Sequence, residues 1–306
     1  MKNTPSDEPR VTVLMSAYNH EKYVEQAIRS VVNQTFQDFE LIVIDDGSSD
    51  STPEILNRLS EEYSFYFERQ ENAGLTPTLN KLNRMARGTC ITGCASDDFW
   101  PPTRLEEQVA VLDAHPDVAF VHGVPSEVNE DGDVVVERCF KLDQMLDGDS
   151  AFEDLIWLRK RFQTTTHMMR RIVWEELGGY DETIEVEDVD WMLRVTRNYK
   201  VMAVDKVWNY YRKHGDNWTM SKSGADKLIR SEQKVARKLG LRYGMPFLFR
   251  RIPSWLLICR RSGNPRGYRY LWLILFFFWH RAFLRDFCLI VSGGKFPRVL
   301  GLIPQK

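Results

Sequence analysis

Residues 11–49 read VTVLMSAYNHEKYVEQAIRSVVNQTFQDFELIVIDDGSS, with two apolar runs, 11–16 and 41–44, that have the length of buried strands. Between these runs, apolar side chains recur at helical spacing: Val24, Ala27, Ile28, Val31 and Val32. The order strand, helix, strand with short connections predicts an α/β fold with a parallel sheet. Ligands of such a sheet gather at the carboxyl ends of its strands.

The same alternation continues to about residue 114. We expect strands at 65–69 and 89–93, and a helix at 78–86. Two further helices are expected to begin with capping boxes, Ser51 with Glu54 and Thr103 with Glu106. From Val118 the pattern predicts short strands (VAFVH, then DVVVE) and a helix over about 187–197.

The charge is distributed unevenly along the 306 residues. Residues 241–306 hold twelve Lys or Arg and one acid, a net charge of +11, whereas residues 1–240 have a net charge of −13. We therefore expect a catalytic part over 1–222, with halves 10–100 and 101–222, and a basic, aromatic, helical extension over 223–306. The acidic body and the lack of a nucleic-acid-binding motif argue against nucleic acid as a partner.

Three further features bear on location. The five cysteines are scattered without C-x-x-C spacing, which is typical of reduced thiols in an intracellular protein. The first ten residues lack the apolar core of a secretory signal. The longest apolar run, Leu271–Trp279, is too short to cross a hydrocarbon core of roughly 30 Å.

Two acidic pairs follow predicted strands, Asp45-Asp46 and Asp97-Asp98. Carboxylates at this edge can bind a divalent cation that in turn binds a diphosphate, or accept hydrogen bonds from a base or a ribose. Each pair alone could also simply end a strand in a turn. The first turn, SAYNH at 16–20, contains no glycine, so it is neither a dinucleotide fingerprint nor a P-loop.

Four ordered segments resemble the family 2 glycosyltransferases with the GT-A fold: residues 11–56, NAGLTPTLNKLNRMARG with TGCASDDFWPPTRLEEQV, MMRRIVWEELGGYDETIEVEDVDWMLRV, and YYRKHGDNWTMS. Together they cover roughly residues 10–221. The resemblance implies an inverting, metal-dependent transfer of a sugar from a nucleotide sugar, with uracil the commonest base. The sequence departs from the family pattern at Ala95, where many members carry a third acid.

The resemblance also assigns roles to individual residues. Tyr18 would stack on the nucleobase with Ser16 beside it, and Asp46 would read the edge of the base. Asp97 would lie near the ribose, and Asp98 would lie nearest a Mn²⁺ or Mg²⁺ ion. His214 would help to hold the metal and diphosphate, and Asp188 would be the catalytic base.

Helical geometry alone does not say whether Glu187 or Asp188 faces the site, and an acidic pair there could equally favour the start of a helix. The makeup of the extension suits docking on the inner face of the cell membrane, near a lipid-linked saccharide acceptor. It could instead pack on the catalytic part or on a second copy of the chain. A non-catalytic sugar-nucleotide-binding partner protein and a sugar nucleotidyltransferase are the alternative functions.

Overall fold

The computed structural model describes residues 8–215 and 221–264, and the chain divides into two compact units. The first unit comprises the chain up to residue 155 together with 159–214. The second comprises 156–158 and the chain from residue 215 onward. The structural division therefore lies close to, but before, the boundary at residue 222 that the sequence suggests.

The first unit begins with the alternation expected from the sequence. Its strands and helices are β1 (Val11–Ala17), α1 (Val24–Val32), β2 (Phe39–Asp45), α2 (Thr52–Tyr63), β3 (Tyr66–Arg69), α3 (Leu75–Met85), β4 (Cys90–Gly93) and α4 (Arg104–Ala114). Then follow β5 (Val118–Val128), β6 (Val134–Val136), α5 (Ala151–Ile156), β7 (His167–Arg170), α6 (Arg171–Leu177), α7 (Asp188–Asn198) and β8 (Lys200–Arg212).

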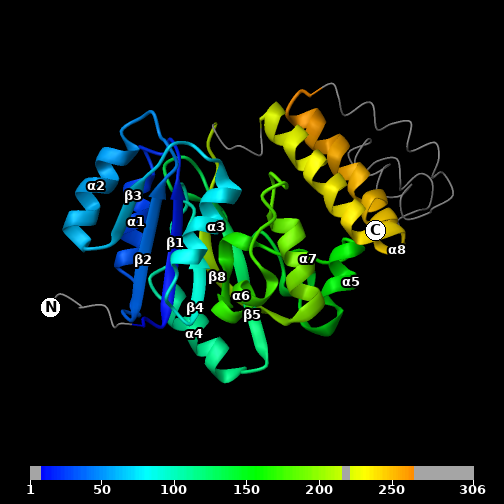
Figure 1. The fold of residues 1–306 in the computed structure, drawn as a ribbon, viewed down its shortest axis with the longest axis horizontal. Coiled ribbons are helices and arrows are strands. Elements are labelled where there is room, and N and C mark those ends of the chain that lie inside the picture. The colour runs from blue at the N-terminus through cyan, green and yellow to red at the C-terminus, as the bar shows by residue number, and fades with distance from the viewer. Residues whose placement is uncertain (1–7, 216–220, 265–306) are drawn as a thin grey trace. The chain divides into compact units, whose positions relative to one another are not determined.

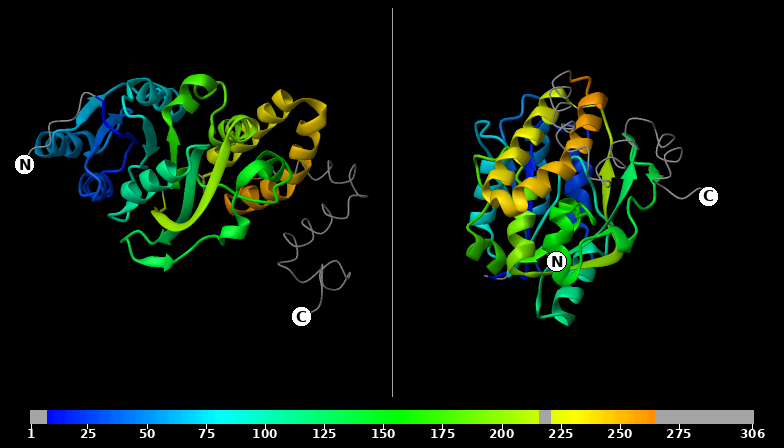
Figure 2. Two further views of the ribbon diagram at one scale, coloured as in Figure 1. Left: turned by 90° about the horizontal axis from the view of Figure 1, so that it is seen from below. Right: turned by 90° about the vertical axis from the view of Figure 1, so that its right-hand side faces the viewer.

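All eight strands form one sheet in the order β3-β2-β1-β4-β7-β5-β6, with β8 pairing with β5. Strands β1 to β4 are parallel to their neighbours among themselves, whereas β7 runs antiparallel to both β4 and β5. Helices cover both faces of the sheet (Figures 1 and 2). This mostly parallel, helix-flanked sheet confirms the predicted α/β fold class.

One core joins the sheet to α1, α2 and α4. The predicted helical stripe of α1 is buried, with Val24, Ala27, Ile28 and Val31 fully covered against the strands. The first strand, VTVLMSA, is buried along nearly its whole length, as expected for a strand with helices on both sides. These buried side chains fix the carboxyl ends of β1, β2 and β4 at one edge.

Neither predicted capping box forms. Ser51 makes no side-chain cap bond at α2, and Asp50 Oδ1 instead accepts a hydrogen bond from the Thr52 amide at 3.0 Å. Thr103 makes no cap bond at α4, and Glu106 accepts a hydrogen bond from the Thr35 hydroxyl. At α2 a neighbouring side chain thus replaces the expected cap, whereas at α4 Glu106 is bonded to a residue distant in the sequence.

The second unit contains α8 (Lys222–Arg261), which folds back on itself at Gly240 so that its two halves lie side by side (Figures 1 and 2). Gly240 has φ 67°, a conformation that favours glycine. None of the helices within residues 8–215 and 221–264 is both long and apolar enough to cross a membrane. The apolar run Leu271–Trp279 lies outside the described residues.

Candidate functional site

The loop after β1 is tied to the loop after β2. Asn19 has φ 54°, and its side-chain oxygen accepts a hydrogen bond from the Ser49 amide at 2.8 Å. The amides of Asn19 and His20 donate to the hydroxyls of Ser48 and Thr52, both at 2.9 Å. The two segments SAYNH and DDGSSDST, read separately in the sequence, therefore form one surface at the edge of the sheet.

Tyr18 and Asp46 lie on this surface in different environments. The Tyr18 side chain is 48% exposed, whereas Asp46 is buried. The Asp46 carboxylate accepts three hydrogen bonds, from Gln70 Nε2, the Ala73 amide and the Gly74 amide. Ser16, half-buried near the end of β1, pairs with Ile44 in β2. The exposed ring of Tyr18 thus lies at the same sheet edge as the carboxylate of Asp46, which binds the 70–74 loop.

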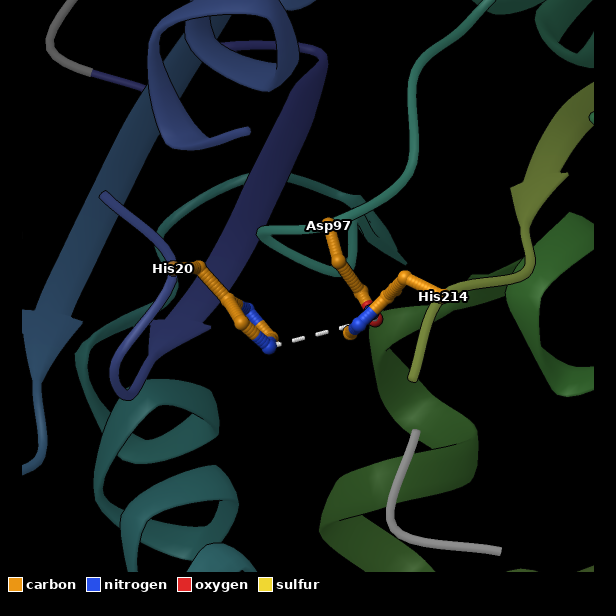
Figure 3. A group of neighbouring side chains, drawn as sticks. All are labelled: His20, Asp97 and His214. Carbon is orange, nitrogen blue, oxygen red and sulfur yellow. Dashed lines mark hydrogen bonds and ion pairs between the residues drawn. The ribbon is translucent and has the colours of Figure 1, made fainter. Parts of the chain in front are cut away.

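His20, Asp97 and His214 converge on one point from three segments, the loop after β1, the turn after β4 and the end of β8 (Figure 3). Asp97 Oδ2 lies 3.2 Å from His214 Nε2 and 4.0 Å from His20 Nε2. One ligand atom from each residue lies within 4.8 Å of the others. A hydrogen bond of 2.7 Å joins His20 Nδ1 to the Ser96 hydroxyl, which leaves Nε2 directed at Asp97.

Two imidazole nitrogens and one carboxylate oxygen are a donor set for a first-row divalent metal. Among the described residues, this trio is the only group of three or more His, Cys, Asp or Glu side chains with that spacing. The ring of Tyr23 packs against His214 with centroids 4.8 Å apart, and so walls one side of the trio. The residues present therefore fit a bound metal ion.

Asp98 has a different environment from its neighbour Asp97. Its carboxylate is almost completely buried and accepts hydrogen bonds from Asn209 Nδ2 at 2.7 Å and from the Arg212 amide at 2.9 Å. Burial first, and then the nearby charge of Asp97, raise the pKa of Asp98 to about 8. Asp98 therefore fastens β8 to the turn after β4, and the acid in the trio is Asp97, where the sequence had suggested Asp98.

Arg212 completes this junction. Its fully buried guanidinium donates to the carbonyl oxygens of Asp97 at 2.9 Å and Glu130 at 2.6 Å. The same group lies over the rings of Tyr23 and Phe99, at 4.9 and 5.4 Å from their centroids. Because His214 follows two residues later, these contacts set the position of its imidazole relative to Asp97.

The second acidic pair stands at the start of α7. Asp188 is the first helical residue and Glu187 is the N-cap, and both are half-buried. Burial, and then the negative charge of Asp188, raise the pKa of Glu187 to about 8. Near neutral pH the raised pKa favours the protonated form of Glu187. Asp188 is not part of the trio His20, Asp97 and His214.

The structure thus brings together some of the residues singled out from the sequence and adds others. Asp97 and His214 are in direct contact, and Tyr18, Ser16 and Asp46 lie at the same edge of the sheet. His20 and Asn209 were not anticipated. The departure at Ala95 leaves that position without an acid, and His20 supplies a third potential ligand instead.

Comparisons with known proteins identify the family of the chain. Residues 12–177 match the family model Glycosyl transferase family 2. An uncharacterised glycosyltransferase of Methanocaldococcus jannaschii is 26% identical over 67% of this chain and 71% of its own length. The hyaluronan synthase of Pasteurella multocida is 26% identical over 72% of this chain but only 22% of the synthase. For three mycobacterial relatives, the matched part spans 59% of their length.

Solved structures show the same fold at low identity. Residues 1–349 of TarS from S. aureus, in complex with UDP-GlcNAc, give a TM-score of 0.60 at 18% identity, covering 96% of this chain and 84% of that one. A mannosyltransferase of Pyrobaculum calidifontis, in complex with GDP-Man and Mn²⁺, gives 0.58 at 18% identity, covering 94% and 85%. With more than half of its residues matched by the family model, the chain belongs to glycosyl transferase family 2.

Proposed function

We propose that this enzyme transfers a sugar from a nucleotide-sugar donor, most simply a UDP-sugar, to an acceptor hydroxyl with inversion at the anomeric carbon, one sugar per encounter. The observation that carries the proposal is the trio His20, Asp97 and His214 at the edge of the sheet where Tyr18 is exposed. Solved structures of the same fold in complex with UDP-GlcNAc and GDP-Man support a nucleotide sugar as the donor.

In this proposal the exposed ring of Tyr18 stacks on the nucleobase, with Ser16 beside it. A carboxylate has about four acceptor positions. Three hydrogen bonds already reach Asp46, so one position remains for a base N–H. These three bonds also hold Asp46 in place before the donor arrives, which reduces the entropy cost of binding.

Asp97, His214 and His20 would hold the metal. When bound, the metal supplies positive charge that stabilises the leaving diphosphate. The two imidazoles suit Mn²⁺ better than Mg²⁺, because Mg²⁺ prefers oxygen ligands. The Mn²⁺ reported with the mannosyltransferase of the same fold supports this choice.

Asp188 would be the base. It takes the proton of the acceptor hydroxyl as that oxygen bonds to the anomeric carbon, while the bond from this carbon to the diphosphate oxygen breaks and the nucleoside diphosphate leaves. A single displacement of this kind inverts the anomeric configuration. The raised pKa of Glu187 favours the protonated form of that side chain near neutral pH, which supports the choice of Asp188 over Glu187 as the base.

The acceptor in this proposal is a lipid-linked saccharide in surface-glycan assembly, reached at the inner face of the cell membrane. Relatives named hyaluronan synthase and chondroitin synthase support a polysaccharide pathway. The basic, aromatic sequence beyond residue 241 supports the membrane location.

Transfer can be separated from binding with three variants. Calorimetry with UDP-, GDP- and dTDP-sugars, with and without Mn²⁺, should reveal metal-dependent binding of one donor class. Asp97→Asn should lose this dependence, whereas the exposed control His115→Ala should keep it. Asp188→Asn should bind the donor normally. Its rate of donor hydrolysis or sugar transfer should fall by about 10² to 10⁴-fold.

Different results would point to the alternatives. Normal donor binding with no turnover in the unmodified enzyme would indicate a non-catalytic binding partner. Release of pyrophosphate from a nucleoside triphosphate and a sugar phosphate would indicate a nucleotidyltransferase. Full activity of Asp188→Asn would refute the base assignment.

A further inference from the structure

The fold-back of α8 is tight and well defined. A Cβ atom at Gly244 would lie 2.0 Å from the carbonyl oxygen of Ala236 on the opposite arm. Only glycine therefore fits at this position, next to the turn. Gly240 supplies the left-handed residue at the turn itself. The sequence GLRYG at 240–244 therefore fixes where the hairpin reverses.

The two arms are joined by buried contacts. Glu232 on the first arm is 2% exposed, accepts a hydrogen bond from Trp255 Nε1 and pairs with Arg251 at 3.0 Å. Ile229 and Ile252 pack in the same cluster. At the open end, Asn264 donates to the Lys222 carbonyl and to Asp226. The hairpin thus holds its tip, residues 237–245, in a fixed shape.

The hairpin tip exposes apolar side chains that its own arms do not cover. Leu241 is 85% exposed and Met245 is 39% exposed. A single exposed apolar residue is ordinary on a protein surface. Here, however, the two side chains lie at a well-defined turn and share it with the exposed cations Arg237 and Arg242.

The surrounding charge has a single sign. From Gln233 to Asn264 the sequence contains eight Lys or Arg and no Asp or Glu. Nucleic acid would match these cations but offers no apolar environment for a projecting leucine, and an acidic protein would need an apolar pocket placed opposite Leu241. A surface of anionic lipids matches both features, because head-group phosphates pair with the cations and the acyl boundary accepts apolar side chains.

We propose that the hairpin tip docks on an anionic lipid surface, with Leu241 and Met245 inserted between head groups and Arg237 and Arg242 against the phosphates. This inference rests on the membrane location in the proposed function and not on the transfer chemistry. It assigns the docking contact to a structured turn of the chain.

The test uses the full chain and co-sedimentation with vesicles of phosphatidylcholine, with and without phosphatidylglycerol. Wild type should bind only the anionic vesicles, and less at high salt. Leu241→Glu and Arg242→Glu should each lower the partition coefficient by about tenfold or more. Arg261→Glu makes the same charge change as Arg242→Glu at the far end of the hairpin, and should have a much smaller effect.

The outcomes distinguish docking through the hairpin tip from the membrane location in general. Tip variants that partition like wild type would overturn docking through the tip while leaving the membrane location standing. A wild type that ignores anionic vesicles would overturn both. Hydrolysis of a soluble donor should be unchanged in the tip variants, and thermal melting should confirm that they fold, because the substituted side chains are exposed.

Discussion

The side-chain amide of Asn209 donates a 2.7 Å hydrogen bond to the buried carboxylate of Asp98, which lies 111 positions earlier in the sequence. This bond fastens β8 to the turn after β4, and thereby brings His214 within 3.2 Å of Asp97. The geometry of the trio His20, Asp97 and His214, the proposed metal site, therefore depends on Asn209 and Asp98, which are not members of it.

Asn209→Ala should weaken both folding and metal binding. The loss leaves a buried carboxylate oxygen without its donor, which should cost about 1–3 kcal/mol in the free energy of unfolding. The affinity for Mn²⁺ should fall about 10 to 100-fold, as for other residues that orient ligands. Urea unfolding and Mn²⁺ titration measure the two effects. Asn57→Ala, at an exposed position, is the control, and an unchanged Mn²⁺ affinity in Asn209→Ala would contradict the positioning role.

Glu187 should make stability fall as the pH rises. Its pKa is raised from 4.5 to about 8 in the folded chain, so between these values the folded state binds more protons than the unfolded state. The free energy of unfolding should then decrease from pH 5 to pH 8, by at most about 1.4 kcal/mol per pH unit for one proton.

The check is urea unfolding of Glu187→Gln at several pH values, with the exposed Glu185→Gln as control. Glu187→Gln should reduce the slope without abolishing it, because the pKa of Asp98 is raised in the same direction. A slope identical to that of wild type would show that Glu187 is ionised in the folded state.

Tyr18 should contribute to donor binding through its ring and not its hydroxyl. Tyr18→Ala should weaken UDP binding by about 1–3 kcal/mol, the usual range for a base stacked on an aromatic side chain. Tyr18→Phe should bind nearly as well as wild type. Calorimetry with UDP and Mn²⁺ compares the variants, and equal losses in both would point to the hydroxyl.

Arg104 should matter for stability and not for the reaction. Its fully buried guanidinium donates to the carbonyls of Thr165 and Trp208 and to the Thr92 hydroxyl, and lies 3.8 Å from the Trp100 ring centroid. Burial lowers its pKa to about 9. Arg104→Ala should lower the free energy of unfolding by about 3–5 kcal/mol. Urea unfolding measures this loss against the exposed Arg84→Ala, and a loss below that of the control would refute the role.

The strands whose apolar runs are uninterrupted were predictable from the sequence. β1, β2 and β4 are buried along most of their length, and so their apolar composition identifies them. β8 escaped prediction although it is the longest strand. Its burial changes irregularly along KVMAVDKVWNYYR, because its pairing with β5 shifts register at several points. The sequence of β8 therefore shows no regular alternation of apolar and polar residues that would identify it as a strand.

The different environments of Asp97 and Asp98 could not be read from the sequence, because the strand that separates them was not predicted. Two adjacent aspartates give no local indication of which one faces solvent, and it is β8 that covers Asp98 and leaves Asp97 in the trio. His20 escaped for a related reason. A histidine in a polar turn becomes a candidate ligand only when the turn after β4 and the end of β8 are placed beside it.

The junction between Asp98 and β8 also bears on when the protein becomes active during synthesis. A nascent chain that ends before residue 200 contains β1 to β7 and both acidic residues of the turn, but neither Asn209 nor Arg212. The negative charges of Asp97 and Asp98 would then repel each other, and the hydrogen-bond donors of Asn209 and Arg212 that offset this repulsion would be missing. The proposed metal site should therefore form only after the ribosome has released β8 and His214.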